Sequence, residues 1–232
     1  MAPLKEELEK IGRILLEKIP KHLNGKECVL WMKENGKQWK QMEWPGFFFD
    51  EFGVKSLIEK YKGEKGPSVG NTIFDYQNDF VCDLKFHSLN DKNNNRNSWA
   101  ILNDLEAIKR IIADYHGIGF AIGLGTAEYD FDRSFQKWHD ALKGSPSDYV
   151  QKKRAENANS RLRKQSCEFE SIKILFFNSM DDITRGLKEG WIAVFQKGMK
   201  NSNDNPRRGK IMINIDRVPK EFIKFEGAKT NS

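Results

Sequence analysis

The chain of 232 residues contains no hydrophobic run long enough to cross a bilayer. Its longest weakly polar stretch, Ile118 to Ala127, has ten residues and includes three glycines. A membrane-spanning helix needs about 20 predominantly apolar residues. The sequence therefore predicts a protein without a transmembrane helix.

Cysteine and histidine are also scarce. The three cysteines, Cys28, Cys82 and Cys167, lie far apart, and they form no Cys-x-x-Cys pair. Neither they nor the four histidines show the spacing of zinc ligands. The first residues do not have the pattern of a secretory leader. These absences argue against a disulfide scaffold and a zinc domain, and they favour a cytoplasmic protein with reduced thiols.

Apolar residues are frequent enough to form a core. Hydrophobic residues make up 38% of the chain and aromatic residues 12%, which argues against global disorder. No internal repeat and no clear linker interrupts the sequence. We therefore expect residues 1–232 to form a single domain.

Positive charge is concentrated in two segments. The net charge is +6. Residues 151–164 hold six basic residues and one acidic residue, and residues 197–210 hold five basic residues and one acidic residue. The second segment also contains Asn201, Ser202 and Asn203, whose side chains can hydrogen-bond phosphates or base edges. This pattern is typical of a polyanion-binding protein, although solvated surface loops would look the same.

Hydrophobic periodicity predicts an α/β fold. An amphipathic helix is expected over residues 4–19, where Pro20 ends it, and a second helix after the aromatic run 44–52, reaching about Tyr61. Further helices are expected over 100–115 and 131–142, and strands over 117–126, 171–178, 191–196 and 210–215. Helices that alternate with buried strands indicate a layered α/β arrangement.

The most informative segment is a predicted β-hairpin. Residues 71–76 form the first strand, 77–79 the turn and 80–87 the returning strand. Because strand side chains alternate, Asp83, Lys85 and His87 share one face of the second strand. Its other face carries Phe80, Cys82, Leu84 and Phe86. One face is therefore expected to join the core while the other presents polar groups.

Two acids and a lysine meet on this hairpin. Asp75 stands eight residues before Asp83, and Lys85 follows two residues later. Magnesium takes one or two protein carboxylates and completes its shell with water and substrate phosphate. A lysine beside such a site can activate a water or balance the charge on a phosphate undergoing attack. These residue types at this spacing favour the hydrolysis of a phosphodiester.

The segment resembles the signature of the PD-(D/E)xK nuclease superfamily. The string 71–75 followed by 83–87 is similar to the form found in type II restriction endonucleases. The chain departs from the usual pattern in having Phe74 where a proline is common, and aspartate rather than glutamate at position 83. Further similar segments are 102–104, 135–139 with 142–144, 160–164, and 201–203 with 206–207, so that the resemblance covers about residues 44–216.

The resemblance implies a restriction-endonuclease-like core, in which a mixed β-sheet is flanked by helices. Asp75 and Asp83 would then bind Mg2+, and Lys85 would orient or activate the water. Asp79 is a rival for the first acid, but it lies in the predicted turn. Some relatives add an acid from a preceding helix, and either Asp50 or Glu51 stands in a suitable place.

The roles of the two histidines are less defined by the pattern. His87 continues the polar face and is a candidate for contact with phosphate or with metal-bound water, although a structural histidine is an equal alternative. His139, beside Trp138, is interpreted as a packing residue of a helix.

The expected function is that of a Mg2+-dependent, sequence-specific endonuclease acting on double-stranded DNA. A homodimer is expected, because a palindromic site is most simply matched by a two-fold protein. The candidate DNA-contacting residues are Ser160, Arg161, Arg163, Lys164, Asn201, Asn203, Arg207 and Lys210. Two alternatives remain open: a repair or recombination nuclease without base specificity, and a DNA-binding module that hydrolyses nothing.

Overall fold

A computed structural model describes residues 2–36, 38–67, 73–146, 148–156, 158, 160–196, 198–199 and 208–230. Three of the candidate DNA-contacting residues, Asn201, Asn203 and Arg207, therefore lie outside the described residues. The helices are α1 (Ala2–Lys18), α2 (Gly25–Asn35), α3 (Trp44–Lys60), α4 (Leu105–Tyr115), α5 (Ser134–Leu142), α6 (Asp148–Ala155), α7 (Met180–Glu189) and the short 3-10 helix η1 (Lys220–Phe222). The strands are β1 (His22–Asn24), β2 (Glu64–Lys65), β3 (Tyr76–Gln77), β4 (Val81–Ser88), β5 (Trp99–Asp104), β6 (Ile118–Tyr129), β7 (Lys164–Phe177), β8 (Ile192–Phe195), β9 (Lys210–Asn214) and β10 (Ile223–Ala228).

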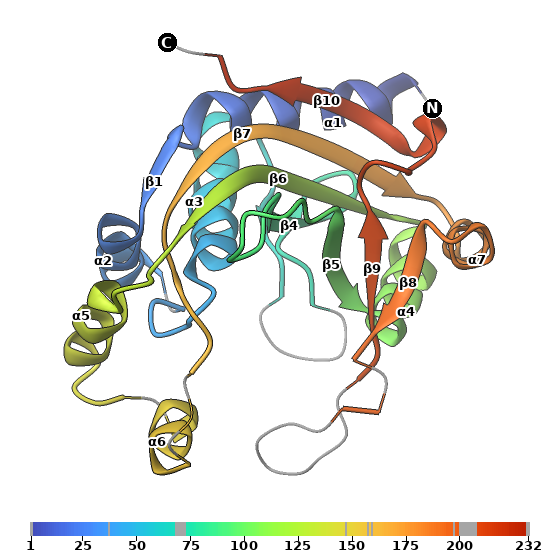
Figure 1. Ribbon diagram of the computed structural model, residues 1–232. Coiled ribbons are helices and arrows are strands. Elements are labelled where there is room, and N and C mark those ends of the chain that lie inside the picture. Colours follow the sequence, from blue (N-terminus) through green and yellow to red (C-terminus); the bar gives the residue numbers. More distant parts are fainter. Residues whose placement is uncertain are drawn as a thin grey trace.

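The strands of the described residues form one large mixed sheet and one small antiparallel sheet. The large sheet has the order β1-β7-β6-β4-β3-β2, and β10 also pairs with β7. β4 runs parallel to β6, whereas the other pairs are antiparallel. The small sheet has the order β5-β9-β8. Figure 1 shows the long strands β6 and β7 arching across the molecule, with β4 and β5 beneath the arch.

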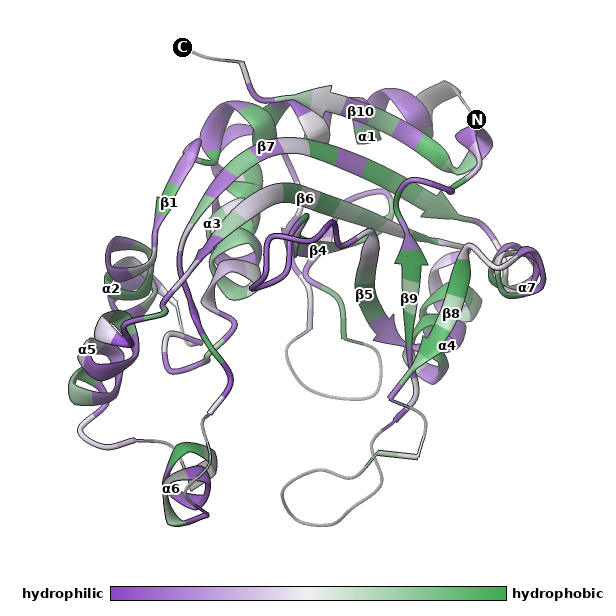
Figure 2. Cartoon of the chain, in the orientation of Figure 1, coloured by the Kyte–Doolittle hydropathy of each residue, from purple (hydrophilic) through white to green (hydrophobic). Residues whose placement is uncertain are grey.

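Two hydrophobic clusters hold these layers together. The first joins α1, α2 and α3 to the large sheet, and it includes Leu8, Leu15 and Phe49. The second joins α4, α7 and the small sheet to the large sheet, and it includes Ile111 and Ile213. In Figure 2, hydrophobic residues run along strands β8 and β9. The expected α/β class, with a mixed sheet flanked by helices, is confirmed.

Several predicted elements lie where the periodicity placed them. The first helix and the helix that begins at the aromatic run correspond to α1 and α3, and the expected strands 191–196 and 210–215 correspond to β8 and β9. No helix in the described part of the chain is long and apolar enough to cross a membrane.

The helix predicted over residues 100–115 is wrong in its first part. Residues 99–104 form the strand β5, and helix α4 begins only at Leu105. Ala100 and Leu102 are buried while Ile101 is 43% exposed, which is the two-residue period of a strand. The side chain of Asp104 accepts a hydrogen bond from the Ala107 N–H at 2.8 Å and thereby caps the helix.

The predicted hairpin is present, although its first strand is short. β3 holds only Tyr76 and Gln77 and pairs with β4 in antiparallel register. Residues 73–75 precede it without strand pairing, and residues 71 and 72 lie outside the described part. As expected from alternation, Cys82 and Leu84 join the first core, so the opposite face of β4 carries Asp83 and Lys85.

Candidate active site

The hairpin brings Asp75, Asp83 and Lys85 together. Asp83 and Lys85 project from the same face of β4, and Asp75 immediately precedes β3. One oxygen of Asp75, Oδ2, accepts a hydrogen bond from the Leu84 N–H at 2.7 Å. Lys85 Nζ lies 3.6 Å from the same oxygen and donates a hydrogen bond to Asp83 Oδ1. The lysine thus bridges the two acids.

Burial and the neighbouring charges both shift the pKa values of Asp83 and Lys85. Asp83 is only 1% exposed, and this burial raises the pKa of its carboxyl well above the ordinary value. Burial alone would lower the pKa of Lys85, but the charges of Asp83 and Asp75 outweigh it and raise that pKa. The two acids therefore favour the charged form of Lys85.

A residue that the sequence pattern did not single out completes this group. Asn103 on β5 donates a hydrogen bond from Nδ2 to Asp83 Oδ2. The segment 102–104 belongs to the family resemblance, but the helix expected over 100–115 does not predict a strand at Asn103. The hydrogen bond between Asn103 and Asp83 depends on strand β5, which contacts β4 in the fold.

These side chains line a pocket of about 230 Å³. Two further cations, Arg208 and Lys210, also line it, and Arg208 Nη1 stands 3.8 Å from Asp104 Oδ2. Lys210 was predicted as a DNA contact, whereas Arg208 was counted only as part of a basic segment. The full lining is Ile73, Asp75, Asp83, Lys85, Asn103, Asp104, Ala107, Arg208 and Lys210.

Of the two candidates for an additional acid, Asp50 lies with the site. It shares an adjoining hollow with Asp75 and Lys85, and its buried Oδ1 has no hydrogen-bond partner among the described residues. Burial, followed by the charge of Asp75, raises the pKa of Asp50 to about 8. Glu51 instead pairs with Lys65 at 2.7 Å.

The rival first acid is not part of the site. Asp79 is exposed in the turn, and its Oδ2 lies 2.7 Å from Lys62 Nζ. Asp75 therefore remains the first acid.

His87 has a structural role in this fold. Its ring is buried, and Nε2 lies 2.8 Å from the carbonyl oxygen of Asn97. Burial lowers the pKa of His87, which keeps the ring neutral. The interpretation as a contact to phosphate or metal-bound water is corrected accordingly, because the ring is occupied inside the protein and does not line the pocket.

Two of the candidate DNA contacts are buried within the protein. Arg163 is 2% exposed and binds Asp140 at 2.8 Å and His139 Nδ1 at 3.1 Å. Ser160 is buried, and its hydroxyl accepts a hydrogen bond from Arg133 at 3.0 Å. Both side chains are buried and held by partners inside the protein, so the structure does not support their assignment as DNA contacts. His139 is fully buried, as its interpretation as a packing residue predicts.

Of the two neighbouring cations, Arg161 is exposed and Lys164 is largely buried. Both pair with Glu43, at 3.1 and 2.7 Å. Glu43 in turn lines the same hollow as Asp50, Asp75, Lys85 and Lys210. This hollow and the pocket share Asp75, Lys85, Asn103 and Lys210, and together they form a depression that has Glu43 in its lining on one side and Arg208 on the other.

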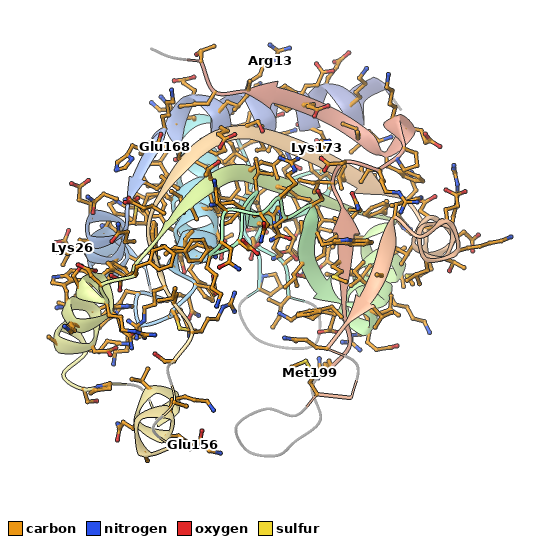
Figure 3. The ribbon with its side chains drawn as sticks, viewed as in Figure 1. Arg13, Lys26, Glu156, Glu168, Lys173 and Met199 are labelled. Atoms are coloured by element: carbon orange, nitrogen blue, oxygen red, sulfur yellow. The ribbon has the colours of Figure 1, made fainter. Side chains whose placement is uncertain are left out.

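The described parts of both basic segments lie below the arch of β6 and β7 (Figures 1 and 3). Figure 3 labels Glu156, which follows α6, and Met199, which follows β8. Strand β4, which carries Asp83 and Lys85, and strand β5, which carries Asn103, also lie beneath this arch.

The donor set fits a magnesium ion better than a metal held entirely by protein. Among the described residues, no three His, Cys, Asp or Glu side chains gather into a complete metal cage. Asp75 and Asp83 provide two carboxylates beside an open pocket, which is the number Mg2+ ordinarily takes from a protein. Asp50, with its unpartnered oxygen, lines the adjoining hollow, but it does not gather with Asp75 and Asp83 into a three-ligand group among the described residues.

Comparisons of the chain with protein-family models, with curated proteins and with solved structures find no match.

Proposed function

We propose that this protein is a Mg2+-dependent endonuclease that hydrolyses double-stranded DNA at a specific site, in the manner of a type II restriction enzyme with a restriction-endonuclease-like core. The observation that carries the proposal is the meeting of Asp75, Asp83 and Lys85 in one pocket that Arg208 and Lys210 also line. Acids to hold a divalent cation, a fixed ammonium group and cations for a polyanion are the parts that phosphodiester hydrolysis requires.

Asp75 and Asp83 are the residues that would hold Mg2+, with Asp50 as the additional acid. When bound, Mg2+ supplies Lewis-acid polarisation of the scissile phosphate and lowers the pKa of a water. Burial raises the pKa of Asp83 and of Asp50 and so disfavours their charged forms, which a bound divalent cation would stabilise.

Lys85 acts as a cation and a hydrogen-bond donor in this proposal. Its raised pKa means that it does not accept a proton at neutral pH. Anchored by Asp83 and Asp75, its ammonium group orients the attacking water and stabilises the charge that develops on the phosphate. Arg208 and Lys210 would bind the neighbouring phosphates of the same strand.

The wider DNA-binding surface follows the depression beside the acids. Arg161, Lys164 and Lys210 remain proposed contacts, and Arg208 joins them. Asn201, Asn203 and Arg207 stay predictions. A homodimer would match a palindromic site. The three cysteines are buried free thiols, which is compatible with the proposed cytoplasmic setting.

The test is cleavage of a fully sequenced, unmethylated phage DNA with Mg2+ and with EDTA. Lys85→Ala is compared with the control Lys188→Ala, which removes an exposed lysine of α7 that does not line the pocket. Discrete fragments that require Mg2+ and disappear only in Lys85→Ala are expected. A smear would favour the nuclease without base specificity. DNA binding with no cleavage under any condition would favour the binding module.

A further inference from the structure

Both oxygens of Asp83 are engaged by side chains from different parts of the fold. Lys85, on the same strand, binds Oδ1, and Asn103, on β5 of the small sheet, binds Oδ2. Asp83 is almost completely buried, so its carboxylate has little water to orient it. Its direction is therefore determined by these two donors.

Asn103 lies at an irregularity of strand β5. Ile101 lies opposite Met212 and Asp104 lies opposite Lys210. Two residues of β5, Leu102 and Asn103, thus face the single residue Ile211 of β9, which is the arrangement of a β-bulge. Leu102 is buried and Asn103 only partly so, which continues the alternation of the strand and turns Asn103 away from the core.

Both sequence neighbours of Asn103 are fixed by contacts with the rest of the fold. Leu102 is 2% exposed and packs in the second hydrophobic core. Asp104 caps helix α4 through its hydrogen bond to the Ala107 N–H at 2.8 Å. Asn103 is therefore placed by its neighbours, and its amide is a rigid partner for Asp83.

An amide suits this position chemically. It donates a hydrogen bond to a carboxylate without bringing a charge that competes with a cation. Each oxygen of Asp83 keeps a further lone pair, so the carboxylate can still bind a metal ion. A lysine or arginine at position 103 would neutralise Asp83, and an acid would repel it.

We propose that Asn103 is the positioning residue of Asp83: it holds the carboxylate in the orientation that binds the divalent cation, and so sets the metal requirement of the site. This inference rests on the proposed nuclease function. Partners that orient a metal ligand typically contribute about 10- to 100-fold to metal affinity or activity. Losing this one should weaken metal binding more than it slows cleavage at saturating metal.

The experiment compares the wild-type protein with Asn103→Ala, Asn103→Gln and Asn97→Ala. Mn2+ binding to the free protein is measured by electron paramagnetic resonance, and cleavage is followed over a Mg2+ titration. Asn97→Ala is the control, because it loses hydrogen bonds with the end of β4 and with Trp99 but does not touch Asp83. Circular dichroism checks the folding of each variant.

Asn103→Ala should bind Mn2+ about 10- to 100-fold more weakly and need correspondingly more Mg2+, while cleavage at saturating Mg2+ recovers to within a few-fold of wild type. Asn103→Gln, which retains an amide, should have an Mn2+ affinity between those of Asn103→Ala and the wild type. Asn97→Ala should keep the wild-type metal requirement. If Asn103→Ala does not fold, Asn103→Ser is judged by the same criterion.

Unchanged Mn2+ affinity and an unchanged Mg2+ requirement in Asn103→Ala would overturn the inference and leave the nuclease proposal intact. A loss of activity that is independent of metal concentration would overturn it as well, because it would indicate a structural role. A wild-type protein that neither binds Mn2+ nor cleaves would overturn both proposals.

Discussion

At the scale of single residues, the candidate site concentrates charge that is costly to bury. Asp50, Asp75 and Asp83 lie around one lysine, and the side chain of Asp50 has an oxygen without a hydrogen-bond partner in the described structure. Burying a charge that is not fully paired destabilises a fold. Such a group is retained when it serves a function, so stability and activity should respond to its removal in opposite directions.

Replacing Asp50 with asparagine tests this opposition. Asp50→Asn should raise the free energy of unfolding in EDTA by about 1–2 kcal/mol, because it removes a carboxyl group whose ionisation is disfavoured first by burial and then by the charge of Asp75. It should also reduce Mg2+-dependent cleavage at least about tenfold. Urea unfolding and a cleavage assay measure the two effects, with the exposed Asp114→Asn as the control. A variant that is both less stable and fully active would contradict the placement of Asp50 in the site.

Two arginines two residues apart have different surroundings and should behave differently. Arg163→Ala should lower the free energy of unfolding by about 3 kcal/mol, because the buried Asp140 loses this ion pair while it keeps the one with Lys143, and because His139 loses a hydrogen-bond donor. Arg161→Ala should change stability by less than about 0.5 kcal/mol and should weaken DNA binding. Urea unfolding and fluorescence anisotropy separate the two outcomes. The reverse pattern would show that the assignment of the buried and the exposed arginine is mistaken.

At the scale of elements, the position of β4 depends on how closely helix α3 approaches the sheet. Phe49 of α3 packs directly over Gly123 of β6, where an added Cβ would lie 2.3 Å from the ring. Gly53 of the same helix faces Leu84 of β4 at 2.7 Å by the same measure. Glycines at these two contacts allow α3 to pack closely against the sheet. This packing places Asp50 of α3 beside Asp75 and Lys85.

A methyl group at Gly123 should push these two layers apart. Gly123→Ala is expected to destabilise the protein by about 1–3 kcal/mol, since overpacking a close contact forces the ring or the helix to move. Gly119→Ala in the same strand is the matched control, because its added Cβ would meet nothing closer than 3.4 Å. We expect its stability to change by less than about 1 kcal/mol in thermal or urea unfolding. Equal effects at both glycines would show that α3 and β6 do not pack this closely.

At the scale of the whole molecule, positive charge from separate parts of the chain lies along one depression. Arg161 and Lys164 precede or begin β7, whereas Arg208 and Lys210 lie at the start of β9. The acids lie between these two pairs. A duplex lying in the depression would contact cations on both sides of its scissile phosphate.

Salt dependence measures these contacts directly. Binding to a duplex in EDTA should weaken steeply as the NaCl concentration rises, because bound counterions are released. Arg208→Ala and Lys210→Ala should each reduce the slope of log K against log salt by about one, while Lys188→Ala should leave it unchanged. Fluorescence anisotropy over a salt series gives the slopes. Slopes that match wild type in both site variants would mean that DNA does not lie over this pocket.

The sequence by itself determined what depends on local spacing. Alternation along β4 places Asp83 and Lys85 on one face, and a tight turn returns Asp75 beside them, so this group was predictable. The helix over residues 4–19 followed from its apolar period in the same way. These features need only residues that are neighbours along the chain or across one hairpin.

The tertiary structure decided the features that depend on distant partners. Successive helix residues point about 100° apart, so only the docking of α3 could show that Asp50 faces the acids while Glu51 turns to Lys65. Only the packing of α5 against the start of β7 could show that Arg163 is buried beside Asp140. Asn103 meets Asp83 because β5 of the small sheet lies against β4 of the large sheet. Such contacts join segments that are remote in sequence, and local periodicity carries no information about them.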